Sequence, residues 1–318
     1  MPYRRFIIII NLRYAQRIPI IDRRTLLPLH VDGAFSSSDS GLLSKFRGMS
    51  GIQRHPVRVG RKVLGVAGIL SFTALIFILR LRLTGKARSI EARAVWLQQC
   101  CRRLLRFLNV RVRYTGEPPD HGLLVSNHVS YLDILVLGQR RPMVFVSKSE
   151  VRAWPFLGWL TACAGTLFIK RASKGDVLRI AEEFSPLIEQ GSVIGLFPEG
   201  TSSDGRQVLP FRSSLLEPAV AKGWPVSAAW IGYSLQDGSV PDEVCYWGDM
   251  GFGSHLLNLL SKERIDAWVA YGSPVEPGMN RKQMARALHA RVCALKGLHE
   301  SGGQSPDPDR VMIARERE

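Results

Sequence analysis

The chain has 318 residues, 46% of them hydrophobic, and a formal net charge of +16 that is unevenly spread. Residues 1–115 carry 22 Lys and Arg against 4 Asp and Glu, whereas the remainder carries 21 against 23. A basic segment suits nucleic acid or an anionic membrane surface, but no groove-reading element accompanies it, so we expect no nucleic-acid partner. The five cysteines include no C-x-x-C pair, which argues against a zinc site or a disulfide framework and favours a reducing compartment.

The N-terminal part contains a stretch apolar enough to enter a membrane. Residues 1–60 show no clear periodicity, and we interpret them as a disordered or mis-started extension, with Met49 as an alternative start. Residues 63–79 carry no charge over 17 positions, at the short end of the roughly 17–25 residues that span a bilayer. Basic residues flank both ends, so flanking charge sets no orientation. We expect membrane-associated helices over residues 61–110; a full span, a dip into one leaflet and a buried helix of a soluble core are the alternatives.

The end of this part, residues 92–110, mixes Leu, Val and Phe with Arg in the manner of an amphipathic helix. One interpretation places this helix on a membrane interface. The other is an ordinary surface helix packed on the domain, and the sequence favours neither.

From residue 110 the pattern changes to short apolar runs separated by helical stretches. The runs, bounded by Gly, Pro or polar residues, cover 111–114, 123–126, 143–147, 165–169, 193–197, 226–230 and 267–271. The helical stretches cover 134–137, 174–190, 215–222, 255–262 and 279–295, the last with Asn280 as an N-cap. This alternation predicts an α/β fold, a mainly parallel sheet flanked by helices, over residues 111–298. Residues 299–318, with two prolines and mixed charges, are expected to form a disordered tail.

A histidine and a carboxylate follow the apolar run at 123–126, in the segment Asn127-His128-x-x-x-x-Asp133. A carboxylate on one ring nitrogen fixes the imidazole tautomer and stabilises the imidazolium formed on proton transfer, which makes a base near neutral pH. Positions i and i+5 do not share a helix face, so contact requires His128 in the loop or first turn and Asp133 inside the helix. The alternative is a histidine that caps a helix and an aspartate in solvent.

The sequence contains no motif for a side-chain nucleophile or a metal site that would act together with His128. It contains no G-x-S-x-G elbow and no H-E-x-x-H metal signature, although Ser126 and Ser130 lie near His128 in the chain. We therefore favour direct attack by a substrate hydroxyl that His128 activates, a chemistry that needs neither a metal nor a cofactor.

Two later blocks each follow a strand-like run, where α/β folds place ligands. The first runs from Gly165 through apolar positions into Lys170 and Arg171, a basic pair suited to phosphate. The glycine of the second block allows a close backbone approach to a ligand. That block reads Phe197-Pro198-Glu199-Gly200-Thr201. Either block alone indicates no more than a turn with solvated charges.

Together, in this order, the blocks resemble the motifs of the glycerolipid acyltransferase family over roughly residues 90–295. The family's first motif, N-H-x-x-x-x-D, is matched by Asn127, His128 and Asp133. The second, a glycine followed by an apolar stretch and an arginine, is matched by Gly165, Phe168, Ile169 and Arg171. The third, F-P-E-G-T, is matched by residues 197–201, and the fourth, an apolar patch with a Pro-Val pair, in part by Trp224-Pro225-Val226.

The resemblance implies an α/β fold whose N-terminal helices seat the active site on the membrane. It implies that His128, held by Asp133, deprotonates a lysolipid hydroxyl as that oxygen attacks a thioester, acyl-CoA or acyl-carrier protein, which is the co-substrate. It also implies an inner (cytoplasmic) membrane location among membrane lipids, with the catalytic domain facing the cytoplasm. The substrate-binding residues that the resemblance implies are Asn127, Gly165, Lys170, Arg171, Phe197, Pro198, Glu199, Gly200 and Thr201.

The acceptor implied first is 1-acyl-sn-glycerol-3-phosphate, in phospholipid biosynthesis, with lyso-ornithine lipid as the alternative. In many family members that acylate lysophosphatidate an arginine follows F-P-E-G-T, whereas here the position is Ser202. Arg206 or Arg212 could supply the missing cation, and relatives that acylate lyso-ornithine lipid have a similar Thr-Ser-x-Asp-Gly continuation. More distant alternatives are an acyl thioesterase that uses His128 on water and a non-catalytic membrane-binding protein.

Overall fold

The structure, a computed structural model, describes residues 55–153, 157–169, 174–275 and 278–302, all within one compact unit, Ser40–Glu318. Several sequence-based predictions lie outside these residues. They are the N-terminal extension up to residue 54 with its alternative start at Met49, the basic pair Lys170 and Arg171, and the tail from residue 303.

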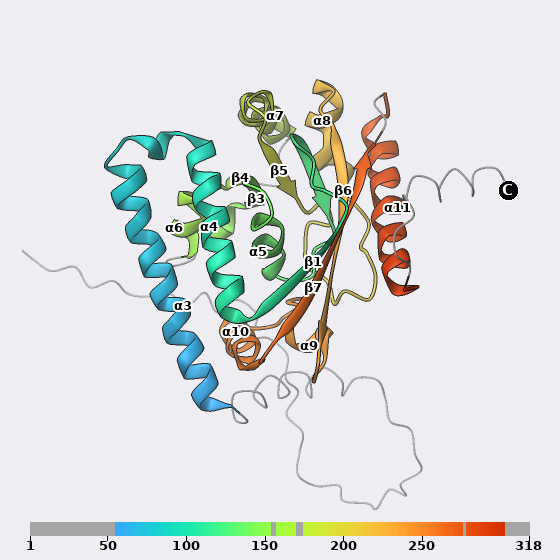
Figure 1. Ribbon diagram of the computed structural model, residues 1–318. Coiled ribbons are helices and arrows are strands. Elements are labelled where there is room, and N and C mark those ends of the chain that lie inside the picture. Colours follow the sequence, from blue (N-terminus) through green and yellow to red (C-terminus); the bar gives the residue numbers. More distant parts are fainter. Residues whose placement is uncertain (1–54, 154–156, 170–173, 276–277, 303–318) are drawn as a thin grey trace, which may run out of the picture. The chain divides into compact units, whose positions relative to one another are not determined.

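The described strands form one seven-stranded sheet in the order β1-β7-β6-β2-β5-β3-β4 (Figure 1). β6 and β7 pair antiparallel, and the other described neighbours are parallel, which confirms the predicted mainly parallel sheet. The bounds are β1 Val110–Thr115, β2 Gly122–Ser126, β3 Met143–Lys148, β4 Leu167–Ile169, β5 Val193–Leu196, β6 Val226–Leu235 and β7 Ile265–Pro274.

β6 and β7 are both longer than the apolar runs that predicted them. The added part of β6 lies in an antiparallel ladder that reaches from Trp230 paired with Ala270 to Leu235 paired with Ile265. The second half of β6 is only half-buried, so it carries no continuous apolar run and escapes detection by hydrophobicity.

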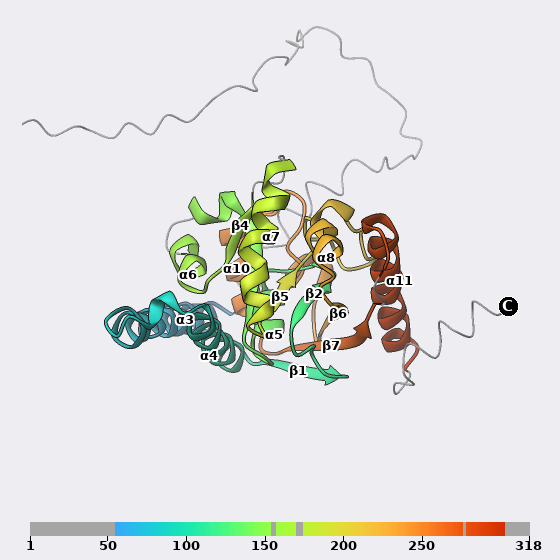
Figure 2. The same ribbon diagram turned by 90° about the horizontal axis from the view of Figure 1, so that it is seen from above.

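Helices cover both faces of the sheet, and each face has its own hydrophobic core. Along β2, Leu123 and Val125 belong to one core and Leu124 to the other, as the alternation of side chains along a strand requires. On the first face lie α7 (Lys174–Glu189), α8 (Glu217–Lys222) and α11 (Arg281–Glu300); on the second lie α4 (Ile90–Leu108), α5 (Leu132–Gly138) and α10 (Phe252–Ser261). Figure 2 shows α11 on one side of the sheet and α4 on the other.

Shorter elements connect these layers. They are α6 (Leu157–Cys163), α9 (Val240–Glu243) and the 3₁₀ turns Lys86–Arg88, Ser149–Ala153 and Ser213–Leu216. The predicted N-cap of the last helix is confirmed, because the Asn280 side chain accepts hydrogen bonds from the backbone of Lys282 and Gln283, both at 3.0 Å. The Asn280 N–H in turn donates to the side-chain oxygen of Gln283. α11 then runs to Glu300, two residues past the predicted end of the catalytic domain at residue 298.

α3 (Pro56–Ile76) begins before the sequence-based boundary at residue 61 and continues as a π-helical segment, Phe77–Arg82. The combined helix of 27 residues is long and apolar enough to cross a membrane, and 17% of its most apolar window is buried. The core helix of a soluble protein would be mostly buried. Large apolar side chains that α3 exposes include Leu64, Phe72 and Leu75.

α4 lies antiparallel beside α3 (Figure 1). Its apolar face, including Trp96 and Leu105, is buried, and Arg102 and Arg106 are exposed. Residues 92–110 therefore form a helix that packs on the domain, a geometry that is compatible with both interpretations of this segment. Lys62 of α3 is buried and donates to the backbone oxygens of Leu108 at 3.1 Å and Lys262 at 2.6 Å, so the start of α3 is attached to the ends of α4 and α10.

Candidate active site

The first and third sequence blocks meet because they follow neighbouring parallel strands. β2 and β5 pair with Val125 opposite Leu196, so the loops that begin at Asn127 and Phe197 leave the same edge of the sheet. Ligands of α/β sheets bind at this carboxyl edge. The two blocks are about 70 residues apart in the sequence, but they are neighbours in space because β2 and β5 are adjacent strands.

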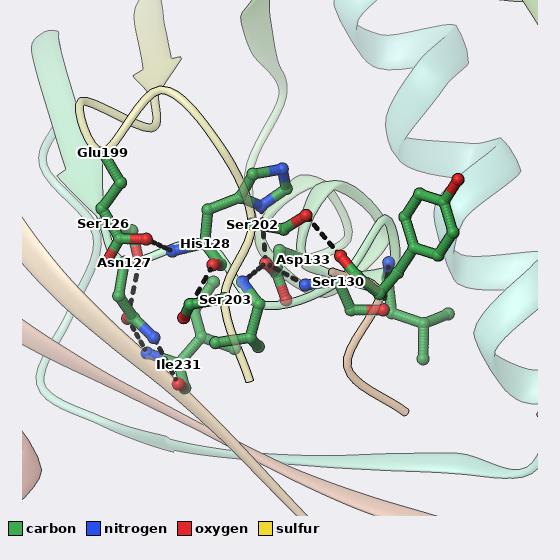
Figure 3. Close-up of polar contacts among 12 residues, drawn as sticks. Ser126, Asn127, His128, Ser130, Asp133, Glu199, Ser202, Ser203 and Ile231 are labelled. Carbon is green, nitrogen blue, oxygen red and sulfur yellow. Dashed lines mark hydrogen bonds and ion pairs between the residues drawn. The ribbon is translucent and has the colours of Figure 1, made fainter. Parts of the chain in front are cut away.

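His128 and Asp133 are in direct contact, with Nδ1 of the imidazole 2.8 Å from Oδ2 of the carboxylate (Figure 3). His128 lies in the loop after β2, and Asp133 is the second residue of α5. This confirms the geometry that the five-residue spacing requires. An ionised carboxylate only accepts hydrogen bonds, so Nδ1 carries the proton and Nε2 keeps its lone pair. The His128 side chain is 22% exposed and that of Asp133 is fully buried.

The buried carboxylate is stabilised by four donors. Besides His128, Oδ2 accepts from the backbone N–H groups of Val129 at 2.8 Å and Ser130 at 2.9 Å. Oδ1 accepts from the hydroxyl of Tyr233 at 2.7 Å. Buried carboxylates are tolerated when their lone pairs are satisfied in this way. The loop between β2 and α5 is therefore folded around Asp133, and the imidazole is fixed as part of that turn.

The third block and the residues just after it hold the backbone of His128 on both sides. Glu199 accepts from the His128 N–H at 3.3 Å and from the Leu209 N–H at 3.1 Å, while the Ser203 N–H donates to the His128 oxygen at 2.9 Å. Glu199 is only 3% exposed. Burial raises the pKa of Glu199 to about 8, with Asp133 adding to the rise and the two backbone donors opposing it. The structure thus places Glu199 behind His128, where it positions the loop.

Among the other residues of this block, Phe197 packs against the imidazole. The Phe197 ring stacks on His128 with centroids 4.2 Å apart and planes 17° apart. The Pro198 oxygen accepts from the Arg212 N–H at 2.9 Å. Gly200 is buried with φ 76°, a left-handed conformation that favours glycine, and Thr201 beside it is exposed.

Asn127 binds the sheet. Its side-chain amide donates to the Ile231 oxygen at 2.9 Å and its side-chain oxygen accepts from the Ile231 N–H at 2.8 Å, and it is 4% exposed. These two hydrogen bonds continue the β2–β6 pairing beyond the end of β2, with the Asn127 side chain in place of a backbone partner. Asn127 therefore fixes where the loop leaves β2 and places His128 next to it.

Gly165 of the second block and the fourth block lie elsewhere in the fold. Gly165 has φ 82° at the end of α6, which Arg93 of α4 contacts by donating to the Cys163 oxygen at 2.9 Å. Its strand, β4, is separated from β2 by β5 and β3, and Lys170 and Arg171 beyond it are outside the described residues. Trp224 and Pro225 precede the first residue of β6, at the end of β2 opposite to His128, since Leu123 pairs with Val226.

Hydroxyl groups near His128 are already bonded. Ser126 and Ser130 are fully buried; the Ser126 hydroxyl donates to Asn127, and the Ser130 oxygen accepts from the Leu132 N–H. The Ser202 hydroxyl donates to the Tyr246 oxygen. This arrangement leaves these serines poorly placed as nucleophiles, in keeping with direct attack by a substrate hydroxyl.

Tyr233 is the contact that sequence reasoning missed. It lies in the half-buried part of β6, 100 positions after Asp133. A lone tyrosine in a strand belongs to no motif, and only the sheet order brings it to the carboxylate.

Fold and site together define an α/β protein with a carboxylate-held histidine at the carboxyl edge of a mainly parallel sheet. Comparison with known proteins gives the family. Residues 109–232 match the family model described as Acyltransferase. The lyso-ornithine lipid O-acyltransferase of Pseudomonas aeruginosa is 39% identical over 200 residues, 62% of this chain and 75% of that protein. The lyso-ornithine lipid O-acyltransferase of Brucella abortus is 34% identical over 64% of this chain and 82% of that one.

A second group of relatives carries a different name. The 1-acyl-sn-glycerol-3-phosphate acyltransferase of Neisseria gonorrhoeae is 32% identical over 48% of this chain and 60% of that protein. Among solved structures, the 1-acyl-sn-glycerophosphate acyltransferase PlsC of Thermotoga maritima is 23% identical, with a TM-score of 0.49 over 75% of this chain and 98% of that one. The chain belongs to the acyltransferase family and is an enzyme that transfers acyl groups.

Proposed function

We propose that this chain is a lysolipid O-acyltransferase in which His128 is the general base. The observation that carries the proposal is the 2.8 Å contact between His128 Nδ1 and the buried Asp133, beside a partly exposed imidazole. This contact leaves Nε2 as the nitrogen that accepts a proton. General bases of this kind contribute about 10²–10⁴-fold to rate.

The reaction takes place as one acyl transfer. Nε2 of His128 removes the proton of the acceptor hydroxyl while that oxygen attacks the thioester carbonyl carbon. Asp133 stabilises the imidazolium that forms. The carbon–sulfur bond then breaks, the imidazolium returns its proton to the leaving thiolate, and an ester and a free thiol are released. The donor is acyl-CoA or acyl-carrier protein, both of which present such a thioester.

Two observations favour lyso-ornithine lipid as the acceptor over lysophosphatidate, which the resemblance of the sequence motifs implied first. Relatives named lyso-ornithine lipid O-acyltransferase align over 58–64% of this chain, against 48% for the Neisseria lysophosphatidate acyltransferase. Thr201 is followed by Ser202 rather than a cation, and the Ser202 hydroxyl is engaged by the Tyr246 backbone. An uncharged group at this place suits an acceptor without phosphate.

The lysolipid reaches the site from a membrane in which α3 is embedded. Support comes from the 27-residue apolar helix and its exposed Leu64, Phe72 and Leu75. A helix of that length extends about 40 Å, enough for a hydrocarbon core of about 30 Å. We place the enzyme in the inner membrane with the catalytic domain on the cytoplasmic side, where acyl thioesters are made.

The test is an acyl-transfer assay on detergent-solubilised protein. Labelled acyl-CoA and acyl-carrier protein are each offered with lyso-ornithine lipid, lysophosphatidate or lysophosphatidylethanolamine, and the lipid products are separated. We expect diacylated ornithine lipid as the main product, and at least about a hundredfold less of it with His128→Gln. Preferred transfer to lysophosphatidate would overturn the acceptor assignment, and release of free fatty acid without any lipid product would overturn acyl transfer.

A further inference from the structure

Tyr233 contacts the loop between β2 and α5, which carries His128 and Asp133, although it lies about 100 residues later in the sequence. It is two residues after Ile231, so both face the same side of β6. Asn127 binds the Ile231 backbone, and the Tyr233 hydroxyl binds Oδ1 of Asp133 at 2.7 Å. One strand therefore fixes the beginning of the loop through Asn127 and its end through Asp133.

The two carboxylate oxygens of Asp133 have different tasks. Oδ2 accepts from the imidazole and from two backbone N–H groups, all between 2.8 and 2.9 Å. Oδ1 faces β6, and the donor that the described residues provide there is the Tyr233 hydroxyl. Because the Asp133 side chain is fully buried, water is no ready substitute for this hydroxyl.

Tyr233 is a donor throughout the working pH range. Burial and the neighbouring Asp133 raise the pKa of Tyr233 well above its usual value, so the phenol keeps its proton. A fixed donor on Oδ1 holds the carboxylate in one rotamer. It also draws negative charge toward β6 and away from the imidazole.

We infer that Tyr233 is a positioning residue that orients Asp133 toward His128 and moderates the basicity of the His128 imidazole. The inference rests on the proposed role of His128 as general base. Without the phenol hydroxyl, the Asp133 charge is concentrated on the side of His128, and the protonated imidazole is favoured. The carboxylate also loses the contact that fixes its rotamer.

The test is Tyr233→Phe, which removes one oxygen and keeps the ring. We expect kcat to fall about tenfold, the size of one hydrogen bond to a charged group, with unchanged KM for both substrates. The acid limb of the kcat profile should move to higher pH. Around the pair, Glu199 after β5, Asp204 in the following loop, and Cys245 after α9 are other titratable groups, and the variant leaves them in place.

Tyr271→Phe is the matched control. Tyr271 is a buried tyrosine on neighbouring β7, and its hydroxyl has no hydrogen-bond partner in the part of the chain that the structure describes. This variant should keep the wild-type kcat and pH profile. The NMR resonance of the His128 Nδ1 proton gives a readout besides activity, and it should shift in Tyr233→Phe and stay in place in Tyr271→Phe.

If Tyr233→Phe does not fold, site-specific 3-fluorotyrosine at position 233 replaces it. Fluorination makes the phenol a stronger donor, so the acid limb should move the other way, to lower pH. A wild-type pH profile and a wild-type His128 resonance in a folded position-233 variant would overturn the inference. Failure of the proposed function is separate, because it would show as absent lipid product in the wild-type protein.

Discussion

Asp133→Asn separates the charge of the buried carboxylate from its shape. The amide oxygen can take the place of Oδ2, which accepts from His128, Val129 and Ser130 at 2.8 to 2.9 Å. The amide nitrogen then faces Tyr233, whose hydroxyl can turn and accept a bond instead of donating one. We therefore expect the fold to persist while the negative charge beside the imidazole is lost.

The size of the effect follows from that charge. A unit pair about 4 Å apart at an effective dielectric constant of ~20 interacts by about 4 kcal/mol. Loss of this stabilisation from the imidazolium-like transition state lowers kcat about a thousandfold, since ~1.4 kcal/mol is a factor of ten. The assay is acyl transfer at saturating lysolipid and donor, with thermal unfolding in parallel. A folded Asp133→Asn variant with wild-type kcat would refute the reasoning.

Asp133→Ala is the contrasting variant. It leaves four donors without an acceptor, two of them the backbone N–H groups of Val129 and Ser130. Each buried unsatisfied group costs about 1–3 kcal/mol, so the sum approaches the roughly 5–15 kcal/mol that stabilises a whole domain. We expect little folded protein. Equal stability of the Ala and Asn variants in denaturant would show that Asp133 does not organise the turn.

Three further predictions concern stability and membrane binding. Because burial raises the Glu199 pKa from 4.5 to about 8, the folded state holds a proton that the unfolded chain releases, and stability falls as pH rises through this window. Glu199→Gln should remove that fall, worth at most about 5 kcal/mol, and parallel pH curves for both proteins would contradict it. Asn127→Ala should cost about 2–4 kcal/mol in denaturant titration, because it strips two partners from the Ile231 backbone; wild-type stability would be the contrary result. Phe72→Asp on exposed α3 should weaken binding to lipid vesicles, whereas Thr115→Asp on β1 should not; equal binding would exclude α3 as the membrane contact.

The strand–loop–helix units and the central pair were accessible from sequence because they are local. The run at residues 123–126 and the His128–Asp133 spacing lie within one strand–loop–helix unit, where periodicity and helix geometry suffice. The long antiparallel pairing of β6 with β7 was not accessible. Half of β6 is only half-buried, and antiparallel pairing depends on which strand lies alongside, which hydrophobicity does not encode.

The roles of residues within the motifs were harder to predict than the motifs themselves. Asn127 and Glu199 both belong to recognised blocks, and sequence reasoning gave both to substrate binding. The structure shows them buried, Asn127 on the Ile231 backbone and Glu199 on the His128 backbone. A motif indicates that a residue type is needed, but positioning and substrate contact require the same polar groups. The two roles are distinguished only by the group that the side chain bonds, either the protein's own backbone or the substrate.

Tyr233 shows the complementary limit. Its contact with Asp133 depends on β6 lying next to β2, a neighbour relation fixed by the whole sheet. No pattern within a window of the sequence could reveal it.

The most direct test of the central claim is acyl transfer by the wild-type enzyme and by His128→Gln, compared at equal protein concentration. Labelled acyl thioester and lyso-ornithine lipid are mixed with each, and ester and free fatty acid are measured together. The account predicts labelled ornithine lipid from the wild type and at least about a hundredfold less from the folded variant. Undiminished ester formation by His128→Gln would contradict the role of His128 as the base.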